Sequence, residues 1–181
     1  MRKINEIFYS LQGEGFHAGT PAVFVRFSGC NLKCDFCDTR HEEGKDMTDE
    51  EIVEEVLRYP SRMVILTGGE PGLWVDDVLI EALHKAGKYI CIETNGTCVL
   101  PEQIDWVTCS PKQGTVLKVK RMDEVKVVYW GQDVSSYLQL PATHYFLQPC
   151  SCRNTEEVVG YILQHPQWRL SLQTHKLINI P

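Results

Sequence analysis

The sequence predicts an α/β protein built on a partial, about six-stranded parallel βα barrel. Strand-like apolar runs alternate with amphipathic helical segments along the 181 residues, and this alternation is typical of parallel sheets with right-handed crossovers. The strand–helix units are fewer than the eight that close a barrel. Glycine, cysteine and polar residues follow the predicted strands, at the edge where parallel α/β folds carry their active sites.

The first elements have the clearest sequence signals. Residues 22–27 are rich in β-branched and aromatic side chains and predict a strand. Thr48 and Glu51 have the spacing of a capping box, so we expect a helix to begin there and to end at Pro60. Further strands are expected at residues 63–66, 89–93, 106–109, 124–128, 144–147 and 169–172, and further helices at 76–86 and 154–164.

The composition predicts one domain over residues 1–181, because 43% of the residues are hydrophobic and 23% are charged. No apolar run is long enough for a membrane span, and residues 1–15 lack the apolar core of a signal peptide, so we expect a cytoplasmic protein. The formal net charge of −6 argues against nucleic-acid binding. A small anionic ligand held by a few cations remains compatible with it.

Three cysteines, Cys30, Cys34 and Cys37, lie in a C-x3-C-x2-C arrangement directly after the first predicted strand. Thiolates are ligands for zinc or for iron–sulfur clusters. With His41 they could form a zinc site, although structural zinc sites usually take ligands from two separated pairs. The intervening residues are too polar for unligated core cysteines. A [4Fe–4S] cluster held by three thiolates would leave one iron open to another ligand.

A second motif, Gly68-Gly69-Glu70-Pro71, follows the second strand of the predicted barrel. Its glycines and proline are typical of a strand-to-helix turn. A turn alone does not need a carboxylate between glycine and proline. Glycine also lets the backbone approach a ligand closely, so the motif indicates a binding site.

Together the two motifs resemble those of the radical S-adenosylmethionine (SAM) enzymes, with Phe36 at the aromatic position before the last cysteine. The resemblance implies a [4Fe–4S] cluster held by Cys30, Cys34 and Cys37, whose open iron binds the amino and carboxylate groups of SAM. One electron from the reduced cluster then cleaves SAM to a 5′-deoxyadenosyl radical. The GGE motif would hold the methionine amino group.

Within that superfamily the chain resembles the 7-carboxy-7-deazaguanine synthases of queuosine biosynthesis over nearly its whole length. The motifs that carry the resemblance are residues 6–15 (EIFYSLQGEG), 26–32 (RFSGCNL), 37–39 (CDT), 67–71 (TGGEP), 93–96 (ETNG), 110–112 (SPK), 148–149 (QP) and 175–176 (HK), near Pro181. The implied reaction is the radical ring contraction of 6-carboxy-5,6,7,8-tetrahydropterin to 7-carboxy-7-deazaguanine with loss of ammonia.

The resemblance also implies the site residues. SAM would be bound by Phe36, Asp38, Gly69, Glu70, Asn95, Ser110, Pro111, Lys112, Gln148, Pro149, Cys150 and Ser151. The substrate would be bound by Leu11, Gln12, Gly13, Glu14, Arg26, Thr67, His175 and Pro181. Thr39 would coordinate Mg²⁺, which also binds the substrate carboxylate. No residue is assigned as a general acid or base.

Some of these positions allow another interpretation. Arg26 lies within an apolar strand, where it could instead pair with a structural carboxylate. The pair Cys150 and Cys152 departs from the family pattern, and we interpret both as small residues rather than a second metal site. The tail that ends at Pro181 is expected to close the substrate pocket, although chain ends usually fray.

The resemblance further implies a flavodoxin or ferredoxin as electron donor, and a homodimer. Two alternatives remain. A glycyl-radical-enzyme activase shares several of the motifs but acts on a protein partner, without a pterin pocket. A non-catalytic cysteine–metal module would bind zinc and would not cleave SAM.

Overall fold

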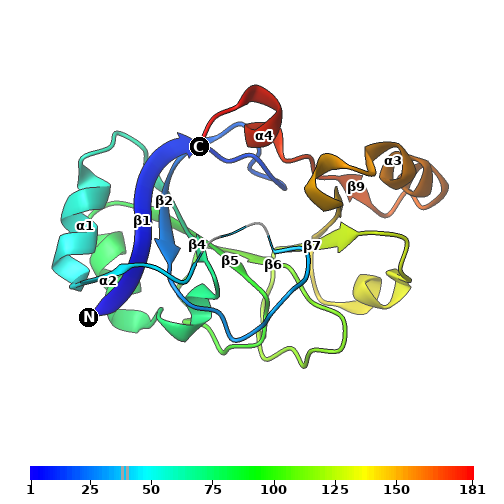
Figure 1. Ribbon diagram of the computed structural model, residues 1–181. Helices are drawn as coiled ribbons and strands as arrows, with labels where there is room; N and C mark the ends of the chain where they lie inside the picture. The colour runs from blue at the N-terminus through cyan, green and yellow to red at the C-terminus, as the bar shows by residue number, and fades with distance from the viewer. Residues whose placement is uncertain (38, 40) are drawn as a thin grey trace.

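A nine-stranded sheet organises the fold, in the order β3-β1-β2-β4-β5-β6-β7-β8-β9 (Figure 1). The computed structural model describes residues 1–37, 39 and 41–181. The strands are β1 (Arg2–Leu11), β2 (Pro21–Phe27), β3 (Lys45–Met47), β4 (Met63–Gly68), β5 (Tyr89–Thr94), β6 (Trp106–Cys109), β7 (Glu124–Tyr129), β8 (His144–Pro149) and β9 (Arg169–Leu170). The helices are α1 (Asp49–Leu57), α2 (Asp77–Lys85), α3 (Thr155–Gln164) and α4 (Thr174–Ile178), with 3₁₀ turns η1 (Pro71–Leu73), η2 (Ser135–Gln139) and η3 (Cys150–Cys152).

The sheet is an open, mostly parallel barrel. Strands β2 and β4 to β9 pair in parallel, whereas β1 and β3 pair antiparallel at one edge. The two edge strands, β3 and β9, are not paired with each other in the described part of the chain, so the barrel stays unclosed. This confirms the predicted partial parallel barrel. All the strands and helices predicted from the sequence are present, with ends that differ by at most three residues.

Three elements were not predicted: β1, β3 and α4. In strand β1 only Arg2 and Ile4 are buried, and polar residues interrupt its ten positions, so it shows no continuous apolar run. Strand β3 has three residues and α4 has five, too few for a periodic signal. At the start of α1, the side chain of Thr48 accepts from Glu51 N–H and the side chain of Glu51 accepts from Thr48 N–H, which confirms the capping box.

The main core lies between one face of the sheet and the helices that cover it. Val64 and Leu66 of β4 belong to this core, as do Ile52 and Val56 of α1 and Leu79 of α2. Burial of these side chains supplies the main stabilising free energy, on the order of 1.5–3 kcal/mol each. Successive side chains along a strand point to opposite faces of the sheet, so the residues between these core positions lie on the other face.

The opposite face of the sheet changes character along the strands. Near the strand starts it carries a small core of four buried residues, Ala22, Phe24, Ile65 and Cys91. Two residues further along the same strands, Thr67 in β4 and Glu93 in β5 are polar. This face therefore becomes polar toward the carboxyl ends of the strands.

The later part of the barrel is reduced. Between β5 and β7, a span that the structure describes throughout, there is one short strand and no helix. None of the helices in the described residues has the length and apolar character needed to cross a lipid bilayer.

Candidate active site

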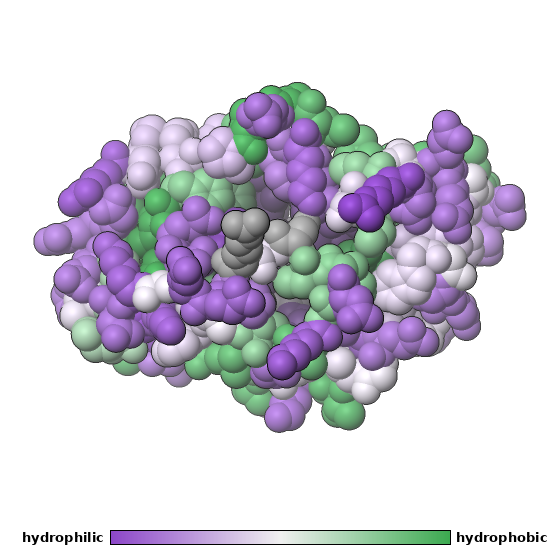
Figure 2. Space-filling view, in the orientation of Figure 1, coloured by the Kyte–Doolittle hydropathy of each residue, from purple (hydrophilic) through white to green (hydrophobic). Residues whose placement is uncertain are grey.

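A cavity of about 570 Å³ opens at the carboxyl ends of the parallel strands. Its walls include residues from β1 and β2 and the loops after them, from β4, β5, β7 and β8, from the segment after β6 and from the C-terminal segment. Figure 2 shows this face of the molecule, with hydrophilic side chains above and below its centre and hydrophobic ones to the right of it. The cavity lies where the topology predicts an active site.

The loop after β2 brings all three cysteines of the C-x3-C-x2-C motif to the cavity. Cys30 and Cys34 are half-buried and Cys37 is exposed. Burial raises the pKa of Cys30, and the nearby Glu70, Cys34 and Cys37 raise it further, against a hydrogen bond from Leu32 N–H. The three thiols thus share one region, where a positively charged group would favour the thiolate form of Cys30.

The three thiols do not converge on one point. Among the described residues, no three His, Cys, Asp or Glu side chains are close enough to hold a single metal ion. Separated thiols are compatible with a [4Fe–4S] cluster, because each cysteine of such a cluster binds a different iron atom. The donor set of three soft thiolates on a polar cavity therefore fits the cluster.

The glycine-rich turn after β4 lies directly against the cysteine loop. Gly69 N–H donates to Phe27 O at 3.1 Å and Glu70 N–H donates to Gly29 O at 2.9 Å. A Cβ atom at Gly69 would lie 2.0 Å from Gly29 O and 3.1 Å from the Cβ of Cys30. Only glycine allows this approach, which fixes the turn beside the first cysteine.

Glu70 holds this turn from behind and does not line the cavity. Its side chain is fully buried and accepts from Thr94 Oγ1 at 2.7 Å, from Asn95 N–H at 2.7 Å and from Gly72 N–H at 2.8 Å. Burial raises its pKa, although these three hydrogen bonds oppose the change. The carboxylate thus ties the turn after β4 to the turn after β5.

Asn95 extends this connection to the cysteine loop. Its side chain donates from Nδ2 to Asn31 Oδ1 at 3.0 Å, and Asn31 Nδ2 donates to Thr97 Oγ1 at 2.7 Å. Three consecutive strand ends are thereby cross-linked by polar side chains. The loop that carries the cysteines is therefore held on its inner side by two neighbouring turns.

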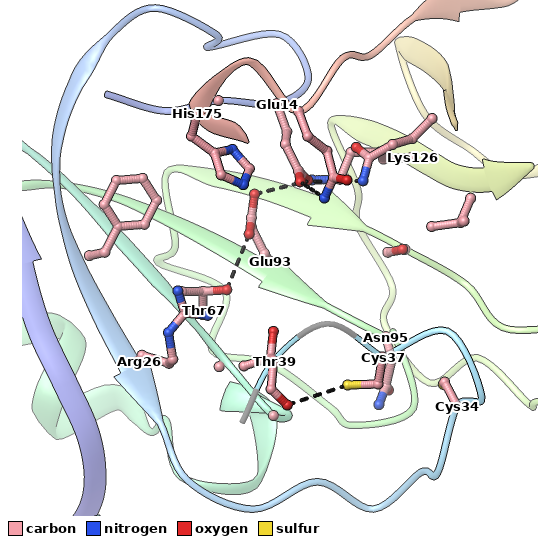
Figure 3. Close-up of a pocket in the computed structure, with 18 of the residues that line it drawn as sticks. Glu14, Arg26, Cys34, Cys37, Thr39, Thr67, Glu93, Asn95, Lys126 and His175 are labelled. Atoms are coloured by element: carbon pink, nitrogen blue, oxygen red, sulfur yellow. Dashed lines mark hydrogen bonds and ion pairs between the residues drawn. The ribbon is translucent and has the colours of Figure 1, made fainter. Parts of the chain in front are cut away.

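A buried group of charges occupies the other half of the cavity. Lys126 Nζ forms an ion pair with Glu14 and lies 3.2 Å from Glu93 Oε1. Glu93 also accepts from Gln12 Nε2 at 3.0 Å and from Thr67 Oγ1 at 3.1 Å. Figure 3 shows Glu14, Glu93 and Lys126 together in the upper part of the cavity, with Cys34, Cys37 and Asn95 in the lower part.

The pKa values in this group shift toward the charged forms. Burial alone would lower the pKa of Lys126, but Glu14 and Glu93 outweigh it and the pKa is raised. Burial would likewise raise the pKa of Glu93, but the Lys126 charge and the bonds from Gln12 and Thr67 lower it. The charged forms of Lys126 and Glu93 are thus favoured, which places an ammonium beside a carboxylate in the cavity wall.

Glu14 is held by two amides as well as by Lys126. Gln173 Nε2 donates to Glu14 Oε1 at 2.8 Å and Gln148 Nε2 lies 3.3 Å from the same atom. Ser171 Oγ donates to Gln148 Oε1 at 3.1 Å. The acidic loop after β1 is therefore bound to the end of β8 and to the chain that follows β9.

A third carboxylate, Glu124, lies near the ion pairs. It is 1% exposed; Oε2 accepts from Phe16 N–H at 2.9 Å, and Oε1 has no partner among the described residues. Burial raises its pKa, Lys126 lowers it, and Glu93 and Glu14 raise it. Gly15, with φ of +65°, packs on this side chain, and a Cβ there would lie 2.1 Å from Oε1.

Arg26 lines the cavity. It also pairs with a carboxylate of the protein, which was the alternative interpretation of this residue. Its Nε donates to Glu6 Oε1 at 2.8 Å, and its guanidinium lies over the Phe8 ring at 5.6 Å. No other hydrogen bond of this side chain is found in the described part of the chain. The rest of the guanidinium is thus available to a ligand.

The C-terminal segment covers one side of the cavity. Thr174 donates to Gly13 O through its backbone N–H at 2.9 Å and through Oγ1 at 3.0 Å. The ring of His175 packs on Gly13 so closely that a Cβ there would lie 2.1 Å from Nδ1. Pro181 O accepts from Ser10 Oγ at 2.8 Å. This tail is therefore anchored to β1 and the loop after it.

Lys112 approaches the cysteine loop from the segment after β6. Its Nζ donates to Ser110 Oγ at 2.7 Å and lies 5.7 Å from the centre of the Phe36 ring. Burial lowers the pKa of Lys112, and the nearby Cys34 raises it. Because burial outweighs the effect of Cys34, the pKa of Lys112 is lowered, and its amine lies close to the cysteine loop.

The structure brings most of the predicted site residues to this one cavity. Those that line it are Leu11, Gln12, Gly13, Glu14, Arg26, Cys30, Cys34, Phe36, Cys37, Thr39, Thr67, Gly69, Asn95, Ser110, Lys112, Gln148, Pro149, Cys150, Ser151, His175 and Pro181. Glu70 and Pro111 lie behind the wall. Asp38 lies outside the described residues.

Sequence reasoning did not assign Glu93 or Lys126. Both stand inside apolar strands, in CIET and VKVV, and a charged residue in a buried strand is an indication of a functional or paired group. Glu93 also begins a motif that was used only for the resemblance. The partners of these residues could not be deduced, because Lys126 and Glu14 are 112 positions apart.

Comparison with known proteins gives a consistent set of relatives. The family model of the radical SAM superfamily matches residues 24–107. The chain is 73% identical over 180 residues to the 7-carboxy-7-deazaguanine synthase of Bacteroides thetaiotaomicron, covering 99% of each chain. It is 41% identical over 206 aligned positions to the enzyme of the same name from Bradyrhizobium diazoefficiens, covering 98% of each.

A solved structure agrees with these sequence matches. The crystal structure of QueE from Escherichia coli superposes with a TM-score of 0.81 at 30% identity, covering 94% of this chain and 93% of that one. The likeness includes the open parallel sheet described above.

Proposed function

This chain belongs to the 7-carboxy-7-deazaguanine synthase family of the radical SAM superfamily, and from that premise we propose how its cavity holds the cofactors and substrate of the family. The family reaction is the radical-mediated ring contraction of 6-carboxy-5,6,7,8-tetrahydropterin to 7-carboxy-7-deazaguanine with loss of ammonia. It is a carbon–nitrogen lyase reaction of queuosine biosynthesis. The chain carries out this reaction with a [4Fe–4S] cluster and SAM.

Cys30, Cys34 and Cys37 hold the cluster, because they are the three thiols on the cavity wall that the family motif requires. When bound, the cluster and SAM supply the abstraction of a hydrogen atom from the substrate. The protein contributes binding, orientation and exclusion of water. Lys112, beside Cys34, partly balances the negative charge of this region.

SAM occupies the part of the cavity next to the cluster. The backbone of Gly69 lets the methionine end approach, and Asn95 offers an amide at the neighbouring strand end. Glu70 acts indirectly, because both of its oxygens hold the two turns in place. The remaining contacts come from Phe36, Asp38, Ser110 to Lys112 and Gln148 to Ser151, with Pro111 supporting the wall.

The substrate pterin lies against the buried charges. Its pyrimidinone ring and exocyclic amine present N–H donors, which match the carboxylates of Glu14 and Glu93. Lys126 and Gln12 fix the orientation of these two carboxylates. Preorganised acceptors of this kind select a heterocycle by its donor pattern and reject analogues that lack a donor. The observation that carries the proposal is this Glu14–Lys126–Glu93 group on the same cavity as the three cysteines.

The substrate carboxylate is bound near Arg26 and Thr39. Arg26 offers the free part of its guanidinium, which suits a carboxylate. Thr39 offers a hydroxyl oxygen to Mg²⁺, an ion that prefers oxygen ligands and needs few from the protein. The support for Mg²⁺ is this position of Thr39 on the cavity wall beside Cys37. No side chain is assigned as the acid or base for ammonia loss.

The tail from Thr174 to Pro181 closes the pocket over the bound substrate. Its hydrogen bonds to Gly13 and Ser10 support this role. We treat residues 1–181 as one domain, since one sheet runs through the whole chain. A cytoplasmic location suits the eight free cysteines. A homodimer and a flavodoxin or ferredoxin donor belong to the proposal as family properties.

The experiment is anaerobic turnover of the reconstituted protein with SAM, Mg²⁺, a chemical reductant and the pterin, followed by mass-spectrometric detection of the deazaguanine. Product is expected from the wild type and from Cys152→Ala, but not from Cys34→Ala, which lacks a cluster ligand. An intact cluster that cleaves SAM without forming product would contradict the substrate and favour an activase. Zinc in place of iron would favour a non-catalytic module.

A further inference from the structure

Strand β1 contains a β-bulge beside the cavity. In its pairing with β2, Ile4 lies opposite Phe27. Two residues further along β1, Glu6 lies opposite Arg26, so Asn5 is an extra residue in β1. In a regular strand residues two apart share a face, yet Ile4 belongs to the main core whereas Glu6 lines the cavity. The bulge therefore turns the side chain of Glu6 onto the face that carries the site.

The bulge is anchored to the chain that follows the cysteine loop. Asn5 Nδ2 donates to Glu43 O at 2.8 Å, and Ser28 Oγ donates to the same carbonyl oxygen. Ser28 lies at the end of β2, two positions before Cys30. The place of Glu6 at the cavity is thus set by the backbone on both sides of the cysteine loop.

Glu6 occupies one edge of the Arg26 guanidinium. Its Oε1 accepts from Arg26 Nε at 2.8 Å, and neither Nη1 nor Nη2 has a hydrogen bond to another described residue. The ring of Phe8 lies against the guanidinium at 5.6 Å and stacks on the ring of Phe24 at 4.9 Å. Arg26 is therefore held at one edge by a carboxylate and on one face by a ring, with two terminal nitrogens left for a ligand.

Stability alone does not explain the pair between Glu6 and Arg26. The two side chains are 51% and 22% exposed, and ion pairs with an exposed member contribute little to folding. A carboxylate at the cavity wall would also repel an anionic ligand. Glu6 therefore needs a role in the site that offsets this repulsion.

Arg26 belongs to a row of polar side chains across the inner face of the sheet. It lies opposite Thr67 in the pairing of β2 with β4, and Thr67 Oγ1 donates to Glu93 Oε2 at 3.1 Å. Figure 3 shows Arg26 and Thr67 on one side of the cavity, with Glu93 and Lys126 beyond them. The row thus presents cationic donors at one end and carboxylate acceptors at the other. A planar ligand with a carboxylate at one end and N–H donors at the other matches both.

We infer that Glu6 is a positioning residue for the substrate carboxylate, because it holds Arg26 Nε and so directs Nη1 and Nη2 toward that group. The inference rests on the proposed function, since it deepens the assignment of Arg26 to the carboxylate. A guanidinium binds a carboxylate best through two parallel hydrogen bonds. A side chain that is already restricted loses less conformational entropy when it binds.

The test compares Glu6→Gln with Glu6→Met, two substitutions of similar size that both remove the charge. Only glutamine keeps an oxygen that can accept from Arg26 Nε. The probes are 6-carboxypterin and pterin, two aromatic compounds that differ in the carboxylate alone. Calorimetric titration of the anaerobic holoenzyme, with SAM and Mg²⁺ and without reductant, gives their dissociation constants.

Glu6→Met is expected to bind 6-carboxypterin about tenfold more weakly than Glu6→Gln, whereas the two variants should bind pterin within about twofold of each other. In turnover the same difference should appear in the KM of the carboxylated substrate and not in kcat. Because the side chain of Glu6 is half-exposed, both variants should keep the wild-type iron content and unfolding transition.

Equal dissociation constants of Glu6→Met and Glu6→Gln for 6-carboxypterin would overturn the inference. An equally large difference between the variants with pterin would also overturn it, because Glu6 would then have a general structural role. Failure of the proposed function is distinguishable: the wild type itself would form no deazaguanine and would not prefer 6-carboxypterin over pterin, and the inference would fall with it.

Discussion

Lys126 Nζ lies 3.2 Å from Glu93 Oε1 and also forms an ion pair with Glu14, in a cavity wall where the lysine side chain is only 7% exposed. A buried ammonium between two carboxylates is stable only as a complete set, because removal of one member leaves an uncompensated charge. Burial and pairing thus make this group both a stabilising feature and a rigid recognition surface.

Replacing Lys126 tests this relationship. Lys126→Met leaves Glu14 and Glu93 buried without their cation, so the free energy of unfolding should fall by about 3–5 kcal/mol. The measurement is chemical denaturation followed by circular dichroism. Lys85→Met, at an exposed position on α2, is the control and should change it by less than about 0.5 kcal/mol. Equal effects of the two variants would contradict the assigned role of Lys126.

Glu93 should make stability fall in acid. Its pKa in the folded protein is lowered, so its contribution is present above the pKa of an unfolded Glu, about 4.3, and is lost as pH falls through the folded-state value. The stability difference between wild type and Glu93→Gln should be largest at neutral pH and shrink below about pH 4.3. Denaturation across a pH series measures it, with exposed Glu81→Gln as control. A pH-independent difference would refute the assignment.

Glu124 should have the opposite pH dependence. Its folded-state pKa is raised by burial, so its contribution is complete below about pH 4.3 and is lost as pH rises through the folded-state value. The free energy of unfolding of Glu124→Gln, relative to that of wild type, should therefore rise progressively from acid to neutral pH. The same pH series measures this, and exposed Glu102→Gln should show no slope. A slope of the other sign would mean that the buried carboxylate is stabilised as an anion.

Gly69 should be irreplaceable for the contact between the turn and the cysteine loop. In Gly69→Ala the new Cβ meets Gly29 O at 2.0 Å, so the two backbones must separate and less iron per chain should be retained after reconstitution. Gly160→Ala in α3 has open space around it and should stabilise the helix by about 0.5–1 kcal/mol. Iron and sulfide content and the thermal unfolding transition are measured for both variants and for the wild type. Full iron content in Gly69→Ala would show that the loop tolerates displacement.

Thr39 should affect the requirement for Mg²⁺ but not the cluster. Thr39→Ala is expected to keep full iron content and to raise the Mg²⁺ concentration for half-maximal turnover roughly tenfold or more. Thr39→Ser keeps the hydroxyl and should restore the wild-type value. Anaerobic turnover measured over a Mg²⁺ titration gives the half-maximal Mg²⁺ concentration for the wild type and for each variant. An unchanged titration in Thr39→Ala would remove this residue from the proposed metal site.

Several particulars of the fold and site could be predicted from local sequence. The Thr48–Glu51 cap depends on residues three positions apart, and the cysteine loop and GGE turn are each contained within a dozen residues. Strand β1 could not be predicted, because it gains its order by pairing with β2 and shows no apolar run of its own. Helix α4 forms through its bonds to Gly13, which are also invisible to local patterns.

The sequence alone determined the fold class, the family and the edge of the sheet that carries the site, because these depend on strand order and on motifs with fixed short spacing. Only the tertiary structure decided that Lys126 pairs with Glu14 and Glu93, across 112 and 33 residues of chain, and that Glu70 faces inward to hold two turns rather than lining the cavity. The physical reason is that such contacts depend on sheet register and on which charges burial forces together, and neither is encoded in the spacing of a motif.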